Sequence, residues 1–260
     1  MKFSIIIPTY NSKEYIKECL FSILKSGFND EIIVVDNNSK DGTPFYVKNN
    51  FPKIQVIENS HNFGFGKSAN IGAKKASGEY FIFLNPDTIV FQDSFQRLED
   101  FIQKNSNFGA IGFNLITREG KHENFSFGKK NNLFQILKNK FFLKKDFLPD
   151  APIKVDWVSG AAVVVKNEVF KKIGGFDENF FMYFEDQDLC LRIKNFSYPV
   201  YFLPNAKIIH LGGKGWTSLS FQKKYYYESQ DYFFKKHFGI FQYSLMRVLR
   251  LPLKFLNSKK

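Results

Sequence analysis

Short apolar segments, each followed by a cluster of polar residues, recur through the first third of the chain. They are Phe3–Ile7, Ile32–Val35, Ile54–Ile57 and Tyr80–Leu84. Each has the length of a strand and is largely apolar on both faces, which is typical of parallel strands covered by helices on both sides. The pattern therefore predicts an α/β fold with a mostly parallel central sheet that is flanked by helices.

Segments with helical periodicity lie between these runs. Glu14–Ser26 places an apolar stripe on one face, and Gly27 ends it. Lys67–Ala76 is a second such segment, closed by Gly78. Further along, we expect helices at Gln92–Lys104, Asn167–Ile173, Glu185–Lys194 and from Phe221 onward, and strands at Val155–Val165, Tyr198–Leu203 and Ala206–Ile209. The lysine-rich segment Lys129–Lys145 is expected to be a loop or a surface helix.

The polar clusters follow the strands at the same relative position. They are Pro8-Thr9-Tyr10-Asn11, Asp36-Asn37, Glu58-Asn59 and Asn85-Pro86-Asp87. In open α/β sheets the carboxyl ends of parallel strands meet at one edge, and ligands bind there. The sequence therefore predicts a ligand site at this edge of the sheet.

Bulk composition limits the environment of the protein. Hydrophobic residues make up 44% and charged residues 24% of the 260 residues, which is ordinary for a globular α/β domain. Cys19 lies on an apolar helical stripe, and with Cys190 as the only other cysteine we expect free thiols and a reducing cytoplasm. Phe3–Ile7 is too short for a secretory signal, and no run approaches the roughly 18–20 apolar residues of a spanning helix.

Positive charge and aromatic rings concentrate at the C-terminus. The net charge is +12, and the segment Phe221–Lys260 holds nine Lys or Arg residues against two acidic ones. Its rings include Tyr225-Tyr226-Tyr227 and Tyr232-Phe233-Phe234. Such a composition suits an anionic membrane surface. We therefore expect a helical extension that docks on a membrane, with packing on the domain as the alternative interpretation.

Four acidic or imidazole side chains are candidates for chemistry, and each has a structural alternative. Asp87 ends a strand beside a proline, where a carboxylate binds a hard divalent cation or simply caps a turn. Glu185 and Asp186 open a helix, where one of them acts as a general base or both form an ordinary acidic first turn. His210 follows an apolar strand, where a lone histidine is more often structural than a ligand.

The order of motifs resembles glycosyltransferase family 2, in its rhamnosyltransferase-like branch. The nucleotide-binding half of that family is similar to Ile5–Asn11, Val34–Thr43 and Asn62–Asn70 here. Asn85-Pro86-Asp87 resembles its DxD position, with Asn85 in place of the first acid. Gly174–Glu178 and Tyr183–Arg192 resemble its acceptor-side signature.

The resemblance implies a GT-A fold with separate donor-binding and acceptor-binding regions along the chain. It implies a catalytic domain at residues 1–220, with a nucleotide-sugar-binding half at 1–90 and an acceptor-binding half at 91–220, followed by a basic aromatic helical extension at 221–260. The residues implied to bind the donor are Pro8, Thr9, Tyr10, Asn11, Asp36, Asn37, Asn62, Gly64, Asn70, Asn85 and Asp87. Trp157, Gly160, Glu185 and Asp186 are implied to border the acceptor.

The implied activity is that of a metal-dependent, inverting glycosyltransferase of the hexosyltransferase type. Asp186 is implied to be the catalytic base, and Asp87 and His210 the ligands of Mg²⁺ or Mn²⁺. The implied donor is a nucleotide-diphosphate sugar, with dTDP-rhamnose or a UDP-sugar as candidates. The acceptor is expected to be a lipid-linked saccharide in cell-surface polysaccharide biosynthesis, which places the enzyme peripherally on the inner face of the cell membrane.

Two other function classes fit parts of the sequence. A basic nucleic-acid-binding protein would explain the charge and the lysine-rich aromatic segments. The acidic motifs at the strand ends oppose that class, so no nucleic-acid partner is expected. A nucleotidyltransferase with a similar sheet would need a basic, glycine-rich segment near the N-terminus, and Pro8–Ser12 supplies neither glycine nor positive charge.

Overall fold

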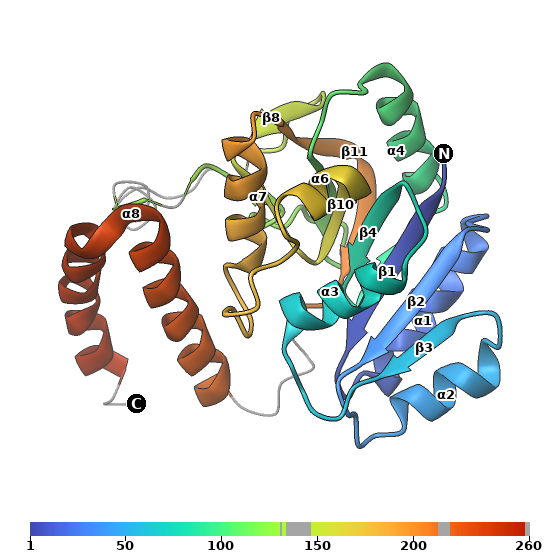
Figure 1. Cartoon of the computed structure of the whole chain (residues 1–260), viewed down its shortest axis with the longest axis horizontal. Helices are drawn as coiled ribbons and strands as arrows, with labels where there is room; N and C mark the ends of the chain where they lie inside the picture. Colours follow the sequence, from blue (N-terminus) through green and yellow to red (C-terminus); the bar gives the residue numbers. More distant parts are fainter. Residues whose placement is uncertain (131, 134–146, 213–218, 258–260) are drawn as a thin grey trace.

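A nine-stranded mixed sheet forms the centre of the protein (Figure 1). The computed structural model describes residues 1–130, 132–133, 147–212 and 219–257. The strand order is β3-β2-β1-β4-β10-β6-β11-β5, and β8 pairs with β11 beside this path. The strands are β1 (Phe3–Thr9), β2 (Glu31–Asp36), β3 (Gln55–Glu58), β4 (Tyr80–Leu84), β5 (Thr88–Val90), β6 (Ala110–Ile116), β8 (Ile153–Val155), β10 (Ala162–Lys166) and β11 (Val200–His210).

The sheet is mixed: six of its nine described strands run in one direction, as expected from its apolar strands, but four of its eight strand pairs are antiparallel. β1, β2, β3 and β4 run in one direction, and β6 pairs in parallel with β11. The antiparallel strand β10 joins β4 to β6. A small second sheet pairs β7 (Phe127–Gly128) with β9 (Trp157–Val158). The carboxyl ends of β1, β2 and β4 therefore share one edge, which is where the polar clusters lie.

Helices cover both faces of this sheet. The helices are α1 (Lys13–Lys25), α2 (Thr43–Asn50) and α4 (Ser94–Lys104) on one face, and α3 (Phe65–Lys75), α6 (Asn167–Lys172) and α7 (Glu185–Asn195) on the other. Side chains alternate across β1, so Ile5 and Ile7 pack toward α1, whereas Ile6 packs toward α3. Cys19 and Cys190 are buried free thiols, one in each layer, as the apolar stripe predicts for Cys19.

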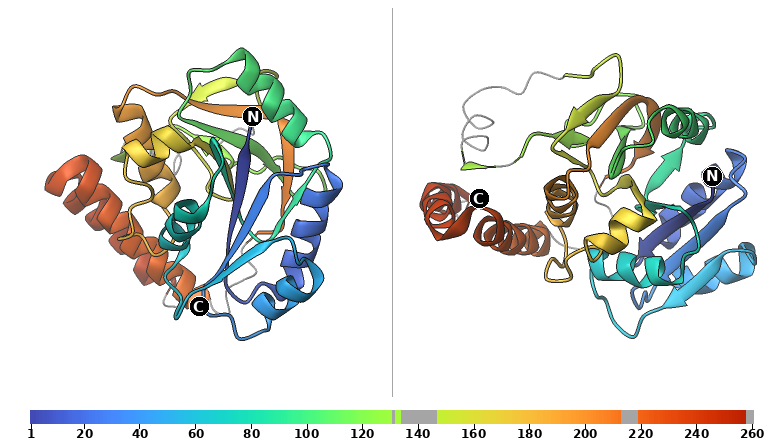
Figure 2. Two further views of the ribbon diagram at one scale, coloured as in Figure 1. Left: turned by 45° about the vertical axis from the view of Figure 1, so that its right-hand side comes forward. Right: turned by 45° about the horizontal axis from the view of Figure 1, so that its top comes forward.

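The last helix, α8 (Leu219–Asn257), is bent back on itself. Gly239 has φ 76° and ψ 176°, so the helix breaks there into two halves. The halves pack side by side through Arg250, which contacts Gln230 and Asp231. Figure 1 and the right-hand view of Figure 2 place α8 beside α7, facing away from α1 and α2. No helix in the described ranges is long and apolar enough to cross a membrane.

Some strand boundaries differ from those expected because pairing partners change along the chain. The expected strand Val155–Val165 is divided among three strands. Val155 ends β8, which pairs with β11, and β9 pairs with β7. β10 lies between β4 and β6 and pairs with both. Conversely, the two strands expected around 198–209 form the single strand β11. Its register shifts between Leu203 and Lys207, which accommodates Pro204. Most of Lys129–Lys145 lies outside the described residues.

The sequence patterns predict neither α2 nor β6, nor the short strands β5 and β7. α2 begins at Thr43, after the N-cap residue Gly42, and has little amphipathic character. β6 contains Gly112 and the buried Asn114, which interrupt an apolar strand pattern. A Cβ at Gly112 would lie 2.4 Å from Val158, and the Asn114 amide donates a hydrogen bond to the Pro204 carbonyl at 2.9 Å. Tertiary neighbours therefore compensate both irregularities in β6.

Candidate functional site

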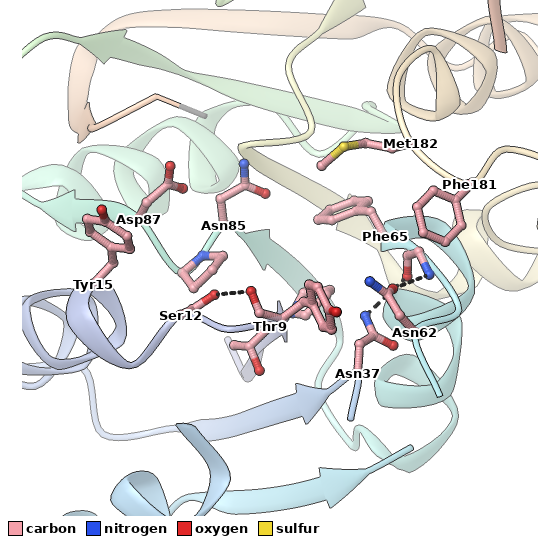
Figure 3. Close-up of a pocket in the computed structure, with 14 residues that line it drawn as sticks. Thr9, Ser12, Tyr15, Asn37, Asn62, Phe65, Asn85, Asp87, Phe181 and Met182 are labelled. Carbon is pink, nitrogen blue, oxygen red and sulfur yellow. Dashed lines mark hydrogen bonds between the residues drawn. The ribbon is translucent and has the colours of Figure 1, made fainter. Parts of the chain in front are cut away.

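A pocket opens at the carboxyl edge of β1, β2 and β4 (Figure 3). The residues that line it are Pro8, Thr9, Tyr10, Ser12, Tyr15, Asn37, Asn62, Gly64, Phe65, Asn85, Pro86, Asp87, Phe181 and Met182. Figure 3 shows Asp87 and Tyr15 at one end, and Phe65, Phe181 and Met182 at the other. We call this cavity the strand-end pocket. Its walls combine amide, hydroxyl and aromatic groups with one carboxylate at the end.

Hydrogen bonds hold the polar wall of the strand-end pocket in place. The Asn37 side chain accepts a hydrogen bond from Asn59 Nδ2 at 3.0 Å and donates one to the Gly64 carbonyl at 3.4 Å. The Gly64 amide donates to Asn62 Oδ1 at 2.9 Å. Gly64 has φ 80°, and a Cβ there would lie 2.1 Å from the Phe181 carbonyl oxygen, so only glycine fits. The pocket wall is therefore preorganised.

Eight of the eleven residues predicted to bind a donor line this pocket, and Asn11, Asp36 and Asn70 do not. The Asp36 carboxylate accepts hydrogen bonds from the Thr9 hydroxyl at 3.2 Å and the Ser39 amide at 2.8 Å. Asn11 contacts the same loop: its backbone amide donates a hydrogen bond to the Ser39 hydroxyl, and its Oδ1 accepts one from the Lys40 amide. These two residues therefore support the pocket from behind.

Asn70 lies on α3 and bonds to the acceptor-side signature instead. Its side chain accepts from the Phe176 amide at 2.9 Å and donates to the Phe176 carbonyl at 2.9 Å. The same amide group donates to Glu178 at 3.1 Å. The Asn70 side chain therefore links α3 to the segment around Phe176, which lies far away in the sequence.

Asp87 and His210 come together at the end of the pocket because β5 pairs with β11. The Asp87 Oδ1 and His210 Nε2 atoms are 3.7 Å apart. On the other side of the ring, His210 Nδ1 is 3.0 Å from Glu123 Oε2. Burial raises the pKa of Asp87, and the adjacent imidazole only partly opposes this. Burial lowers the pKa of His210, but the hydrogen bond to Glu123 and the charge of Asp87 outweigh it and raise that pKa.

The Asp87–His210 pair fits a divalent cation. The distance of 3.7 Å between Asp87 Oδ1 and His210 Nε2 is longer than a hydrogen bond. It is short enough for both atoms to bind one cation through metal–ligand bonds of about 2.0–2.2 Å. The ionised Glu123 carboxylate accepts a hydrogen bond only from an Nδ1 that carries a proton. In neutral His210 the Nε2 lone pair is then free to bind a cation. The described residues contain no group of three or more protein ligands, so diphosphate and water oxygens would complete the shell.

A second cavity, of about 540 Å³, adjoins the strand-end pocket. The two share Phe65, Asn85 and Met182 as a common wall. The other residues that line the second cavity are Phe125, Trp157, Ser159, Gly160, Ala161, Tyr183, Phe184, Glu185, Asp186, Gln187, His210, Tyr226 and Gln230. All four residues predicted to border an acceptor, Trp157, Gly160, Glu185 and Asp186, therefore lie together. We call this space the Asp186 cavity.

Asp186 is held at the start of α7 by two backbone donors. The Gly160 amide donates to Oδ2 at 2.9 Å, and the Gln187 amide donates to Oδ1 at 2.7 Å. A Cβ at Gly160 would lie 3.2 Å from the Asp186 Cβ, so this glycine permits the close approach. Burial raises the pKa of Asp186 despite these two donors. A raised pKa makes a carboxylate a stronger base.

Glu185 and Asp188 differ from Asp186 in their surroundings. Glu185 is buried, and its Oε2 has no hydrogen-bond partner among the described residues. Burial and the neighbouring Asp186 raise the pKa of Glu185, which favours its neutral form. Asp188 pairs with Arg192 at 2.7 Å, as their helical spacing predicts. Of the three carboxyl groups in this acidic turn, Asp186 is the one that lines the cavity with both oxygens held by hydrogen bonds.

Residues 4–173 match the sequence profile of glycosyl transferase family 2. The chain belongs to this family. An uncharacterized glycosyltransferase of Rickettsia typhi is 30% identical over 204 residues, which are 76% of this chain and 60% of that protein. The rhamnosyltransferase WbbL of Escherichia coli is 28% identical over 221 residues, 79% of this chain and 82% of the relative.

A third relative has a name that specifies its acceptor. It is the N-acetylglucosaminyl-diphospho-decaprenol L-rhamnosyltransferase of Mycobacterium tuberculosis, 24% identical over 235 residues, 79% of this chain and 75% of the relative. With the WbbL similarity, this match supports the rhamnosyltransferase-like branch. The chain spans about 60% of the length of the first relatives that it matches.

Solved structures of low sequence identity share the GT-A fold. The mannosyltransferase PcManGT from Pyrobaculum calidifontis, in complex with GDP-Man and Mn²⁺, aligns with a TM-score of 0.61 at 19% identity, covering 82% of this chain and 57% of that one. Staphylococcus aureus TarS 1–349 with UDP-GlcNAc also aligns at 0.61, with 21% identity, covering 83% and 60%. The expected GT-A architecture is confirmed at this level.

Several residues of this family 2 site have no signal in the sequence. Glu123 lies in an irregular loop outside any periodic segment, and only the fold brings it to His210. Tyr226 and Gln230 of α8 reach the Asp186 cavity from far along the chain. The family profile ends at residue 173, before Asp186, His210 and α8. These residues acquire their place only through tertiary packing.

Proposed function

We propose that this family 2 protein is an inverting glycosyltransferase that moves a sugar from a nucleotide-diphosphate donor to a hydroxyl of a saccharide acceptor. The observation that carries the proposal is the meeting of two cavities at Asn85. Asp87 lines one cavity, Asp186 lines the other, and His210 reaches Asp87 from the second. A donor in the strand-end pocket and an acceptor in the Asp186 cavity would meet at this wall. dTDP-rhamnose and UDP-sugars are the candidate donors.

The proposed reaction is a single displacement. Asp186 takes the proton from an acceptor hydroxyl, and that oxygen attacks the anomeric carbon from the face opposite the nucleotide. One displacement inverts the anomeric configuration and needs no covalent intermediate. Asp87 and His210 would hold Mg²⁺ or Mn²⁺, which neutralises the charge of a departing diphosphate when it is bound. Asn85 and the Asn37 amide network orient the donor, since their positions line its pocket.

A lipid-linked saccharide is the proposed acceptor, and cell-surface polysaccharide biosynthesis the proposed process. Support comes from the name of the mycobacterial relative, which specifies a sugar on a diphospho-decaprenol carrier. The Asp186 cavity offers the rings of Trp157, Tyr183 and Tyr226 in its wall. Aromatic rings of this kind pack against the apolar faces of sugars and against alkyl chains. Residues 1–220 are the proposed catalytic domain, and α8 adds Tyr226 and Gln230 to the wall of its acceptor cavity.

Peripheral binding to an anionic membrane at the cytoplasmic face is proposed for the second half of α8. The first half is packed, since Phe233 and Phe234 are fully buried and Arg250 pairs with Asp231. In the second half an apolar stripe faces outward, and Phe241 is 76% and Val248 59% exposed. Arg247 is exposed on the same half, and Lys223, Lys224 and Lys235 are exposed on the first half of α8. This combination suits a headgroup interface.

A panel of sugar nucleotides tests the central proposal. Thermal unfolding of the whole protein is measured with each donor in the presence of Mg²⁺ or Mn²⁺, and the stabilising donors are then assayed for release of nucleoside diphosphate. We expect dTDP-rhamnose or a UDP-sugar to raise the unfolding temperature and to be consumed. Binding of single-stranded oligonucleotides without binding of any sugar nucleotide would overturn the proposal.

A further inference from the structure

The first half of α8 packs on the segment that leads into Asp186. Ser229 Oγ donates a hydrogen bond to the Met182 carbonyl at 2.7 Å. The Tyr226 ring centroid lies 5.7 Å from that of Tyr183 and 5.3 Å from that of Phe184. α8 therefore contacts three consecutive residues that immediately precede the acidic turn.

The contacted segment has a backbone conformation that needs outside support. Tyr183 and Phe184 have φ values of 68° and 65°, in the left-handed region that bulky residues rarely adopt. The turn also lies between the two cavities, since Met182 lines both and Tyr183 lines the Asp186 cavity. Strained conformations of this kind persist only where surrounding contacts enforce them. α8 supplies contacts of this kind directly to the turn.

Ion pairs, two of them to the buried Asp188, fix α8 against the same region. Lys236 Nζ bridges Asp177 Oδ2 and Asp188 Oδ1, each at 2.6 Å. His237 Nε2 lies 2.7 Å from the same Asp188 oxygen. Tyr232 donates its hydroxyl to Asp177 at 2.9 Å. Since Asp177 precedes the turn and Asp188 follows it, α8 is tied to both sides of the left-handed segment.

We propose that the first half of α8 is part of the active site, and that Tyr226 and Ser229 are positioning residues. They hold the Tyr183–Phe184 turn in its left-handed conformation and thereby present Asp186 to its cavity. The role in catalysis rests on the proposed function, because it assumes that Asp186 is the base. The effect on the turn itself does not depend on any chemistry.

Hydrogen–deuterium exchange of the whole protein tests the effect on the turn. The variants are Tyr226→Leu, which removes the ring, and Ser229→Ala, which removes the hydrogen bond to Met182. We expect backbone amides at residues 183–187 to exchange about tenfold faster in each, with strands β1 and β4 unchanged, because only local opening is promoted. Tyr226→Phe and Ser229→Thr keep the ring and the hydroxyl, so they should exchange like the wild type.

Two controls remove the same groups elsewhere on α8. Phe221→Leu removes an exposed ring near the start of the helix, and Ser244→Ala removes an exposed hydroxyl in its second half. Neither should change exchange at residues 183–187. Unchanged exchange there in both Tyr226→Leu and Ser229→Ala would overturn the proposal.

Turnover separates positioning from a purely structural role. The readout is hydrolysis of dTDP-rhamnose or UDP-N-acetylglucosamine without an acceptor. For Tyr226→Leu we expect kcat to fall about tenfold with the donor KM within about twofold of wild type. Faster exchange with unchanged kcat would overturn the positioning role. If the wild type consumes no sugar nucleotide while exchange responds as expected, the proposed function fails and the effect on the turn stands.

Discussion

His210 donates its Nδ1–H to Glu123, and this hydrogen bond of 3.0 Å aims the opposite ring nitrogen at Asp87. Carboxylate partners of this kind set the tautomer and the orientation of metal-binding histidines. We therefore expect Glu123→Gln to weaken Mn²⁺ binding in the presence of a nucleoside diphosphate by about 10–100-fold. Electron paramagnetic resonance of bound Mn²⁺ measures this directly. Glu119→Gln, an exposed change in the same loop, should leave Mn²⁺ binding as in the wild type.

Removal of the cation should abolish sugar transfer. Asp87 supplies the carboxylate at the end of the strand-end pocket, and its burial leaves it little exposed to competing water. We expect excess EDTA to stop transfer and Mg²⁺ or Mn²⁺ to restore it. Asp87→Ala should lower both donor binding, measured by calorimetry, and turnover. Full activity in excess EDTA would show that the Asp87–His210 pair has another role.

Asp186→Asn keeps the shape of the side chain and removes its basicity. Turnover should fall by roughly 10²–10⁴-fold, the usual contribution of a general base. Donor binding should change little, because Asp186 lines the adjoining cavity and not the strand-end pocket. Glu185→Gln is the matched comparison on the neighbouring carboxyl, whose raised pKa already favours the neutral form. Near-normal turnover in Asp186→Asn with loss in Glu185→Gln would reverse the assignment.

The docking of α8 should depend on pH through Asp177. Burial opposes ionisation of this carboxyl, but bonds from Lys236, Asn179 and Tyr232 lower its pKa from 3.8 to about 2. A carboxyl with a lowered folded-state pKa stabilises the fold above its unfolded pKa, and that contribution is lost as pH falls from about 4 to about 2. Asp177→Asn should therefore destabilise the protein by about 1–2 kcal/mol at neutral pH and by much less near pH 2.

Urea unfolding at a series of pH values measures this difference. Asp150→Asn is a suitable control, because it changes an exposed carboxyl in another part of the chain. A difference between Asp177→Asn and wild type that stays constant down to pH 2 would contradict the role of the ionised carboxylate.

Liposome co-sedimentation checks the outward face of α8. The wild type should bind vesicles that contain anionic lipid, and binding should fall as salt is added. Phe241→Asp should weaken binding, because a charge replaces a ring that is 76% exposed. Phe45→Asp changes a ring of similar exposure, 72%, on α2 and should have no effect. Equal binding to neutral and anionic vesicles, or none to either, would rule out electrostatic docking.

Most helices and strands within residues 1–90 follow from local sequence. Tyr80–Leu84 is predicted with its observed bounds, and the helix expected at Glu14–Ser26 is displaced by one residue at each end. Apolar runs bounded by turn residues define such strands without reference to the rest of the chain. The polar clusters after them meet at one edge because parallel strands align their carboxyl ends. Pro8, Asn37 and Asp87 thus share a pocket, as their positions after successive strands predict.

Partners from distant parts of the chain could be found only in the tertiary structure. Glu123 has no periodic context, and its position beside His210 depends on the packing of an irregular loop. The aromatic and basic composition of α8 was consistent with membrane docking and with packing, because both uses need the same residue types. The fold separates packed from outward-facing residues: Phe233 packs on Phe184 and Lys236 pairs with Asp177, whereas Phe241 is exposed after the break at Gly239. Sequence patterns specify which faces are apolar, but long-range contacts decide what each face meets.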